Sequence, residues 1–436
     1  MAATAIAVKG RRGPRSSLLS DALVRDLVAT GQVDVVVGLP TLDNADTVRD
    51  VVRAVHDAFA GPLARERTML LNADGGSTDG TPGIVRGESS DPLEIVTAAH
   101  TLRTVHRVTA PHDGVPGRGG ALHLVFAAAD LLRARVIAVV DADATSLSAE
   151  TVSRLVEPVL RGEYDFVKPV VARSPWEAPL VTQLVRPLMR AAYGKRLLEP
   201  LTTQFACSGA LATEALSADV WDESFAQFGL DAWLAAVTMG GKARIAQVWM
   251  PAAAAPARAR RAHLAEVFEQ VVGGVMACLE ADAGRWLAIE GSDDVPLLGD
   301  RPAVPSARPA FDVESFASMF TQGVHDLGPL LGPVLGDQTL EALTRASESS
   351  PLHISDVLWV SSVHAALIAL HRRMLPRVQI VQSMLPIYLG RVASFFAETA
   401  SMDVEQASMR LEELARAFED AKPTLASLWN TEPTRR

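Results

Sequence analysis

The chain has 436 residues, 48% of them hydrophobic and 21% charged, and this composition excludes an intrinsically disordered protein. A formal net charge of −10 argues against a nucleic-acid-binding protein, and two cysteines are too few for a disulfide framework. The basic segment 9–17 lacks the apolar core of a signal peptide, and the apolar runs are shorter than a bilayer span. We therefore expect a cytoplasmic protein with no membrane span and, from its length, two domains.

The first half of the chain alternates between two hydrophobic periodicities. Apolar runs typical of buried strands occur at residues 33–39, 68–72, 136–140 and 166–171, and 94–98 is a further candidate strand. Helical spacing separates them at residues 46–60, 119–132 and 148–160. This alternation predicts right-handed strand–helix–strand units on a mainly parallel sheet, a Rossmann-like α/β fold.

Helical periodicity alone continues beyond about residue 256. Helices are expected at residues 264–283, 311–320, 340–346, 354–375, 379–399 and 402–421. The Pro- and Gly-rich stretch 291–309 is expected to be a linker or long loop. The predicted organisation is a flexible basic tail at 1–30, a catalytic α/β domain at 31–258 and an all-helical C-terminal domain at 259–436.

The expected helices at 354–375 and 379–399 carry apolar residues around most of their circumference. A helix of this kind is either central in a bundle or shared with a partner. Large apolar patches on soluble chains usually mark interfaces, so we expect a homodimer, with a monomeric bundle as the alternative.

Two carboxylates end the apolar run Val136-Ile-Ala-Val-Val-Asp-Ala-Asp143. Ligands of open α/β sheets bind at the carboxyl ends of strands, and alternation along an extended strand would point Asp141 and Asp143 to the same side. Two oxygen donors suit Mg²⁺ or Mn²⁺, which complete their coordination with phosphate oxygens and water. The alternative is that one Asp caps the next helix while the other is a solvated loop residue.

Three segments ahead of the Asp pair add residues that can bind a ligand. Their glycines permit close backbone approach, the turn after the first strand leads into a helix N-terminus, and Arg118 can pair with a phosphate. Taken alone, each of these loops is more often a simple turn than a ligand-binding site. The occurrence of all three in this order, ahead of the Asp pair, favours a ligand-binding site. The candidate substrate-binding residues in these segments and the Asp pair are Pro40, Thr41, Asp43, Asn44, Asp74, Gly75, Gly117, Arg118, Gly119 and Asp141.

This order of motifs resembles the GT-A glycosyltransferases over about residues 33–250. In that family the turn after the first strand and a segment like Asp74-Gly-Gly-Ser-Thr-Asp-Gly-Thr81 hold the nucleotide. An Asp-x-Asp motif, here Asp141-Ala-Asp143, holds the metal on the diphosphate. Pro116-Gly-Arg-Gly119, Arg186-Pro-Leu-Met189 and Leu198-Glu-Pro-Leu201 are similar to segments of the retaining mannosylglycerate and glucosyl-3-phosphoglycerate synthases.

The resemblance implies a metal-dependent, retaining hexosyltransferase. Its donor would be a nucleoside diphosphate sugar, UDP-glucose or GDP-mannose, and its acceptor a small polar molecule such as glycerate or 3-phosphoglycerate. Asp141 and Asp143 would be the metal ligands. Asp231 would lie near the reacting sugar, which makes Asp143 and Asp231 the candidate catalytic residues. Ser208 and Gly209 fall at the place of the acceptor loop and are further candidate substrate-binding residues.

Two departures from the family pattern bear on activity. The acceptor-loop Glu is replaced by Ala210 within Cys207-Ser-Gly-Ala-Leu-Ala212. The third metal ligand of the family is a His shortly after the strand that ends near Met250, whereas His263 comes several residues later. Three arginines precede it and could neutralise a diphosphate in its place: Arg258, Arg260 and Arg261.

Two other functions remain open from the sequence. A nucleotidyltransferase uses a similar fold and Mg²⁺, but would place a Gly-rich basic loop directly after the first strand, where this chain has Leu39-Pro-Thr-Leu-Asp43. A non-catalytic nucleotide-sugar-binding protein is consistent with Ala210 and the missing His. A serine hydrolase is not supported, because Ser77 and Ser208 have no neighbouring general base in the sequence.

Overall fold

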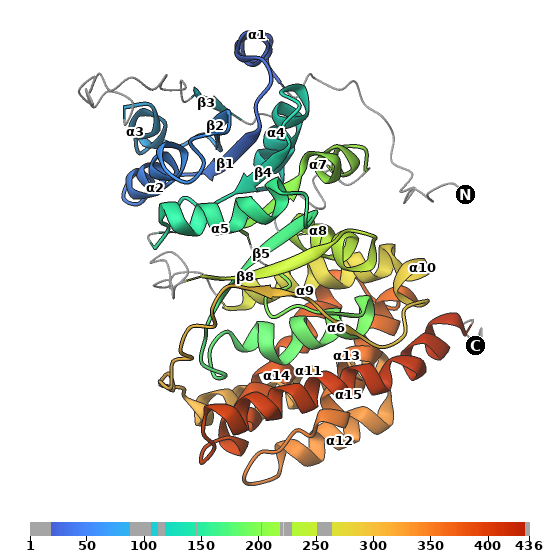
Figure 1. The fold of residues 1–436 in the computed structure, drawn as a ribbon. Coiled ribbons are helices and arrows are strands. Elements are labelled where there is room, and N and C mark those ends of the chain that lie inside the picture. The colour runs from blue at the N-terminus through green and yellow to red at the C-terminus, as the bar shows by residue number, and fades with distance from the viewer. Residues whose placement is uncertain are drawn as a thin grey trace.

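The structure is a computed structural model that describes residues 19–87, 106–111, 118–144, 146–201, 203–218, 221, 229–250 and 264–431. Figure 1 shows a twisted sheet flanked by helices, with a second, all-helical layer packed below it. The candidate strand at 94–98, the candidate site residue Gly117 and the segment that contains His263 lie outside the described residues.

Eight strands form the central sheet in the order β10-β8-β5-β7-β4-β1-β2-β3. All neighbouring strands pair in parallel except β7, which runs antiparallel to both β4 and β5. The strands are β1 (Val35–Thr41), β2 (Thr68–Asp74), β3 (His106–Pro111), β4 (Val136–Val139), β5 (Phe166–Val171), β7 (Phe205–Ser208), β8 (Ile245–Met250) and β10 (Leu297–Leu298). Two short strands, β6 (Lys195–Arg196) and β9 (Asp293–Asp294), pair separately.

Helices cover both faces of the sheet, as expected for strands that are apolar on both sides. Alternate residues of β1 enter different cores: Val35 and Val37 pack with α2 and α5, whereas Val36 packs with α4. The helices of this half are α1 (Asp21–Thr30), α2 (Val48–Ala60), α3 (Thr81–Gly87), α4 (Arg118–Leu131), α5 (Ala149–Leu160), α6 (Arg186–Tyr193), α7 (Gly209–Leu216) and α8 (Gly229–Gly240), and a π-helix, η1 (Val181–Val185), precedes α6.

The helical half shares one continuous hydrophobic core with α4, α6 and α8. In Figure 1, α6 lies between the sheet and the long helix α15. The helices are α9 (Leu264–Ala281), α10 (Ala283–Trp286), α11 (Val313–Leu335), α12 (Asp337–Ser347), α13 (Asp356–His371), α14 (Arg377–Glu398) and α15 (Val404–Asn430). Every described residue from 310 to 420 is helical or in a connection, which confirms the predicted α/β fold with a helical C-terminal region.

Three expectations about the chain need correction. The tail predicted at 1–30 ends earlier, because residues 21–30 form α1, which Leu23 and Leu27 anchor in the core. The expected linker 291–309 contains β10, whose residues Leu297 and Leu298 pair with β8 and extend the sheet. α11 begins near the expected position but continues to Leu335, through Pro329 and Pro333.

The two strongly apolar helices, α13 and α14, are mostly covered by their own chain. Among the described helices only α14 is long and apolar enough to cross a membrane, and 78% of its most apolar window is buried. Val357 of α13 is exposed, whereas Val360, Val363 and Leu367 are buried in the core. Packing within the chain therefore buries most of the apolar residues of both helices, and the homodimer stays a prediction.

The close approach of α11 and α14 requires glycine at position 390. A Cβ built on Gly390 would lie 2.5 Å from Phe320 Cγ and 2.9 Å from Ile354 Cδ1. We expect Gly390→Ala to lower the free energy of unfolding by about 1–3 kcal/mol, because the core must shift to accept the methyl group. Gly273→Ala in α9 is the matched control, since its Cβ would meet only Val381, at 4.0 Å. Urea unfolding measures both, and equal stability of the two variants would contradict this packing.

Candidate functional site

The parallel register of three central strands brings the predicted ligand-binding segments to one edge of the sheet. Thr41 at the end of β1 is in register with Asp74 at the end of β2, and Gly38 of β1 is in register with Val139 at the end of β4. Pro40 and Thr41 are the last two residues of β1, and Gly75 donates its N–H to the carbonyl of Thr41 at 2.8 Å. The turns that follow β1, β2 and β4 therefore meet at this edge.

Asp74 is a buried carboxylate stabilised as an anion. Its Oδ1 accepts hydrogen bonds from Thr41 Oγ1 at 2.8 Å and from Ser77 Oγ at 2.6 Å, and its Oδ2 accepts from the N–H groups of Gly76 and Ser77. Burial alone would raise its pKa, but these hydrogen bonds outweigh burial and hold the pKa below the ordinary value. Asp74 can thus accept a further hydrogen bond from a ligand without becoming protonated.

The turn after β1 is locked to the turn after β2. Asp43, which has a positive φ of 51°, donates its N–H to Ser77 Oγ and accepts the N–H of Thr78 at 2.8 Å. The N–H of Asn44 donates to Thr81 Oγ1, also at 2.8 Å. These reciprocal bonds fix the positions of Asp43 and Asn44 and keep their side chains at the sheet edge.

The side chain of Asn44 connects this turn to the Asp pair. Its Nδ2 donates to Asp143 Oδ1 at 2.7 Å, and Thr47 Oγ1 donates to the same oxygen at 2.9 Å. The extended backbone expected through Asp143 is wrong, because β4 ends at Val139 and the chain turns from Asp141 to Ala144. The two carboxylates consequently have different partners, Asp143 on the β1 side and Asp141 on the opposite side.

Arg118 at the start of α4 joins Asp141 to Asp231. Its Nη1 lies 3.2 Å from Asp141 Oδ1, and its Nε lies 3.3 Å from Asp231 Oδ2. Thr203 completes the group, since its hydroxyl donates to Asp141 and its carbonyl accepts from Arg118 Nη2. Gly119, the next residue of α4, is buried. Thr203 was missed from the sequence because it bears no charge and belongs to no motif.

Lys168 is buried and interacts electrostatically with Asp231, the ion-pair partner of Arg118. Burial raises the pKa of the Asp231 carboxyl above its ordinary value, against the effect of Arg118 and Lys168. Burial lowers the pKa of Lys168 to about 8, although Asp231 and Glu199 favour its charged form. Lys168 Nζ also donates to the carbonyl of Pro200. The sequence does give a signal for Lys168, because it is the one charged residue in the otherwise apolar strand β5.

The donor set of the Asp pair fits a hard divalent cation that arrives with a ligand. Among the described residues no group of three or more His, Cys, Asp or Glu is placed to hold a metal ion. Asp141 and Asp143 supply two carboxylates on one turn, and Mg²⁺ or Mn²⁺ commonly takes one or two protein carboxylates and obtains its other ligands from phosphate and water. The residues present therefore suit an ion shared with a diphosphate.

Two sequence-predicted residues are not brought to this edge. Ser208 is in register with Val136, at the amino end of β4, and its hydroxyl caps α7 by accepting the N–H of Leu211 at 3.2 Å. Gly209 follows it and lies against the carbonyl of Ala134, where a Cβ would collide. Because β7 is antiparallel, its first residues and the preceding Thr203 reach the site while its last residues point away. This corrects the placement of Ser208 and Gly209 in the site.

A cavity of about 610 Å³ opens next to the site, at the ends of β5 and β8 and beside α6 and α15. Its charged lining residues are the arginines Arg173, Arg186, Arg190, Arg196, Arg301 and Arg416 and the acids Glu177, Glu199, Asp294 and Glu412. Six guanidinium groups against four carboxylates give this cavity a net positive charge at neutral pH.

Arg186 is a cation of this cavity that no described carboxylate pairs with directly. Arg173 lies 3.1 Å from Glu199, Arg190 lies 2.7 Å from Glu412, and each is thereby neutralised. The side chain of Arg186 makes no hydrogen bond or ion pair with any described residue. Burial lowers its pKa, against the electrostatic effect of Glu199 and Glu412. An anionic group in the cavity would find this guanidinium available.

The cavity and the sheet-edge site are adjacent. Glu199 lines the cavity, and Thr203 of the site follows four residues later, a separation that an extended chain spans in at most about 14 Å. Lys168 interacts electrostatically both with Asp231 of the site and with Glu199 of the cavity lining. One substrate at each place would therefore be close to the other.

No family model matches the chain, and no curated protein matches it. Solved structures similar to it include glucosyl-3-phosphoglycerate synthase from Mycobacterium tuberculosis with Mg²⁺ and UDP, at 24% identity and a TM-score of 0.42 over 59% of this chain and 83% of that chain. The same enzyme with Mn²⁺, UDP-glucose and phosphoglyceric acid gives 22% identity and a TM-score of 0.42 over 63% and 86%. A mycobacterial protein gives 24% identity and a TM-score of 0.41 over 63% and 80%. The first two are synthases of the kind that the sequence resembles.

The lowered pKa of Lys168 predicts a specific dependence of stability on pH. Between about pH 8 and 10.5 the unfolded chain holds the lysine proton that the folded chain has released, so this residue makes stability rise with pH over that window. We expect the difference in unfolding free energy between the wild type and Lys168→Met to shift in favour of the wild type over the same window. Urea unfolding at pH 7, 8, 9 and 10 measures it. A difference that does not vary with pH would contradict the buried, shifted lysine.

Proposed function

We propose that this protein transfers a hexose from a nucleoside diphosphate sugar to a small anionic acceptor in a metal-dependent reaction. The observation that carries the proposal is the meeting of Asp74, Asn44, Arg118 and the Asp141–Asp143 turn at one sheet edge, beside a cationic cavity. The nucleotide sugar would occupy the edge, and the acceptor would occupy the cavity.

The donor side is built to hold a nucleotide and to stabilise its diphosphate. Asp74 stays anionic and would accept hydrogen bonds from the base or the ribose. Arg118 would turn from its carboxylate partners toward the diphosphate, whose charge grows as the sugar departs. A Mg²⁺ or Mn²⁺ ion held by Asp141 and Asp143 would supply further positive charge to that leaving group. Retention of the anomeric configuration rests on the family resemblance.

The acceptor side would bind an anion through Arg186 and direct a hydroxyl toward the edge. The sugar bond to the diphosphate breaks, a bond to the acceptor oxygen forms, and the hydroxyl proton must be taken up. Asp231 is suited to take this proton, because burial raises its pKa while Arg118 and Lys168 favour its anionic form. Gly117, directly before Arg118 in the sequence, is a further residue that we propose to bind the donor.

The donor and acceptor that we propose to test first are UDP-glucose or GDP-mannose, with glycerate or 3-phosphoglycerate. UDP-glucose and phosphoglyceric acid are also the compounds bound in one of the similar structures. The assay scores release of the nucleoside diphosphate with Mg²⁺ or Mn²⁺, with and without acceptor. Pyrophosphate release from a nucleoside triphosphate would favour a nucleotidyltransferase, and binding without turnover would favour a non-catalytic binder. We also propose a cytoplasmic homodimer, and a light-scattering mass of one chain would contradict the dimer.

Asp143→Ala tests the metal site. We expect a loss of turnover of about 100-fold or more, because the divalent ion would lose its main protein ligand. Stability should change by about 1 kcal/mol or less, since the lost contacts are hydrogen bonds from Asn44 and Thr47 at a partly exposed edge. Asp326→Ala, at an exposed position of α11, is the control and should keep full activity. Asp143→Ala with undiminished turnover in the presence of a chelator would disprove the metal assignment.

A pair of hydroxyl variants tests which end of β7 belongs to the site. We expect Thr203→Val to lower kcat/KM about tenfold, because its hydroxyl orients Asp141. Ser208→Ala should keep its kcat/KM and lose about 1 kcal/mol of stability, since that hydroxyl only caps α7. Steady-state kinetics and thermal unfolding of both variants provide the comparison. A lower kcat/KM in Ser208→Ala with an unchanged kcat/KM in Thr203→Val would instead place the acceptor-binding loop at Ser208.

A further inference from the structure

The wall of the cationic cavity contains a π-helix. In η1 the N–H of Arg186 bonds to the carbonyl of Val181, five residues back instead of four. Such insertions are rare in helices and occur frequently at functional sites. Here the extra residue stands directly before α6, in the segment that carries the unpaired Arg186.

The two sides of this segment have different environments. Ala178, Thr182, Arg186 and Arg190 line the cavity at four-residue spacing. Gln183 lies on the other side and is completely buried. The π-turn therefore separates a side that meets the cavity from a side that meets the C-terminal helices.

Gln183 is held at both its backbone and its side chain by these helices. The indole N–H of Trp359 in α13 donates to the carbonyl of Gln183 at 2.8 Å. Arg391 Nε in α14 donates to Gln183 Oε1 at 3.1 Å. Trp359 and Arg391 are themselves fully buried, so both contacts are made out of water. Two helices that are distant in sequence thus hold one residue on the far side of the segment that lines the cavity.

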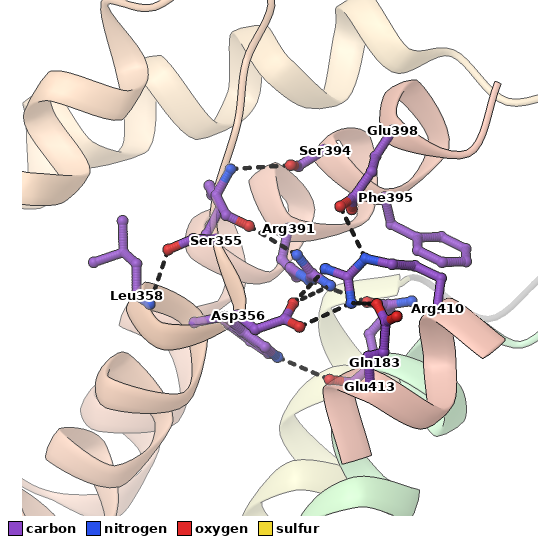
Figure 2. A network of polar contacts seen from close by, with 12 residues as sticks. Gln183, Ser355, Asp356, Leu358, Arg391, Ser394, Phe395, Glu398, Arg410 and Glu413 are labelled. Carbon is purple, nitrogen blue, oxygen red and sulfur yellow. Dashed lines mark hydrogen bonds and ion pairs between the residues drawn. The ribbon is translucent and has the colours of Figure 1, made fainter. Parts of the chain in front are cut away.

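Arg391 is itself fixed by a network of charged groups, which Figure 2 shows. It donates to the carbonyl of Ile354 at 2.7 Å and lies 2.9 Å from Asp356 Oδ1. Arg410 binds both oxygens of Asp356, at 2.6 and 2.8 Å, and donates to Glu398 at 2.8 Å. Burial lowers the pKa of Arg391 to about 10, and Asp356 favours its charged form, so it stays a cation at neutral pH.

The direction of Thr182 and Arg186 depends on the π-turn. If the turn relaxed to ordinary α-helical bonding, the residues before it would rotate by about 100° relative to those after it, the angle of one residue in an α-helix. Thr182 and Arg186 would then no longer face the cavity together. Gln183 opposes this change, because its departure would leave the Nε–H of Arg391 without an acceptor in a buried place.

We propose that Gln183 is a positioning residue. Its hydrogen bonds with Trp359 and Arg391 keep the π-turn in place, and the π-turn directs Thr182 and Arg186 toward the bound acceptor. This inference rests on the proposed function for the identity of that ligand. It assigns to α13 and α14 an indirect part in acceptor binding, although neither helix lines the cavity.

Gln183→Met tests the proposal because it keeps the length of the side chain and removes the hydrogen-bond acceptor. We expect the KM for 3-phosphoglycerate, measured with UDP-glucose, to rise about tenfold, the ratio that corresponds to one lost hydrogen bond to a charged group. The affinity for UDP with Mn²⁺ should stay within about twofold, because the donor residues are not touched. Gln183→Glu retains an oxygen for Arg391 and should restore the KM to within about threefold of the wild type.

Lys422→Met is the matched control for loss of a buried polar contact. Lys422 in α15 donates to the carbonyls of Ala192 and Ile289, at 3.0 and 2.5 Å, and does not line the cavity. This variant should be destabilised with no change in the KM for 3-phosphoglycerate. An equal rise of KM in Lys422→Met, or no rise in Gln183→Met, would overturn the positioning role.

Hydrogen–deuterium exchange separates this inference from the proposed function. Amide protons of residues 181–186 should exchange at least about tenfold faster in Gln183→Met than in the wild type, and at the wild-type rate in Lys422→Met. Unchanged exchange in Gln183→Met would overturn the inference whichever substrates the protein uses. A wild type that turns over no donor and acceptor pair, with the expected exchange, would overturn the proposed function alone.

Discussion

The parallel pairing of β4 with β1 is the constraint on which the candidate site depends. It places Val139 beside Gly38, so that the turn after β4 comes out next to the turn after β1, and Asn44 can reach Asp143. The pairing of β1 with β2 sets Asp74 against Thr41 in the same way. A slip of one residue in either pairing would reverse the faces of the whole strand, so the buried cores on both sides of the sheet also hold the site in register.

The antiparallel strand β7 has the opposite consequence. Its insertion between β4 and β5 carries the chain back across the sheet, so only the residues that enter it, with Thr203 among them, reach the ligand-binding edge. The same segment begins at the cavity with Glu199, and its Pro200 carbonyl accepts a hydrogen bond from Lys168. A run of alternating charges, Arg118, Asp231, Lys168 and Glu199, thereby connects the two proposed substrate positions. Their proximity gives a physical basis for bringing an anionic donor and an anionic acceptor together against their mutual repulsion.

Local patterns were sufficient to predict the alternating strands and helices of the first half and the helices of the second. They were also sufficient to place Thr41, Asn44, Asp74, Arg118 and Asp143 at the sheet edge, because each ends or follows a strand or begins a helix. Patterns could not reveal the direction of β7, which depends on pairing between residues far apart in the sequence. Ser208 and Gly209 were therefore placed at the site, whereas Thr203 was overlooked. Gln183 could not be predicted for a related reason. Its hydrogen bonds are with Trp359 and Arg391, which lie about 180 and 210 residues further along the sequence.

The central claim is that the sheet edge and the cationic cavity serve one transfer reaction. A crystal structure of the protein with UDP, Mn²⁺ and 3-phosphoglycerate tests it most directly. The account predicts UDP between Asp74 and the Asp141–Asp143 turn, with 3-phosphoglycerate beside Arg186 and its hydroxyl facing Asp231. UDP bound elsewhere, or 3-phosphoglycerate outside the cavity while UDP occupies the edge, would contradict it.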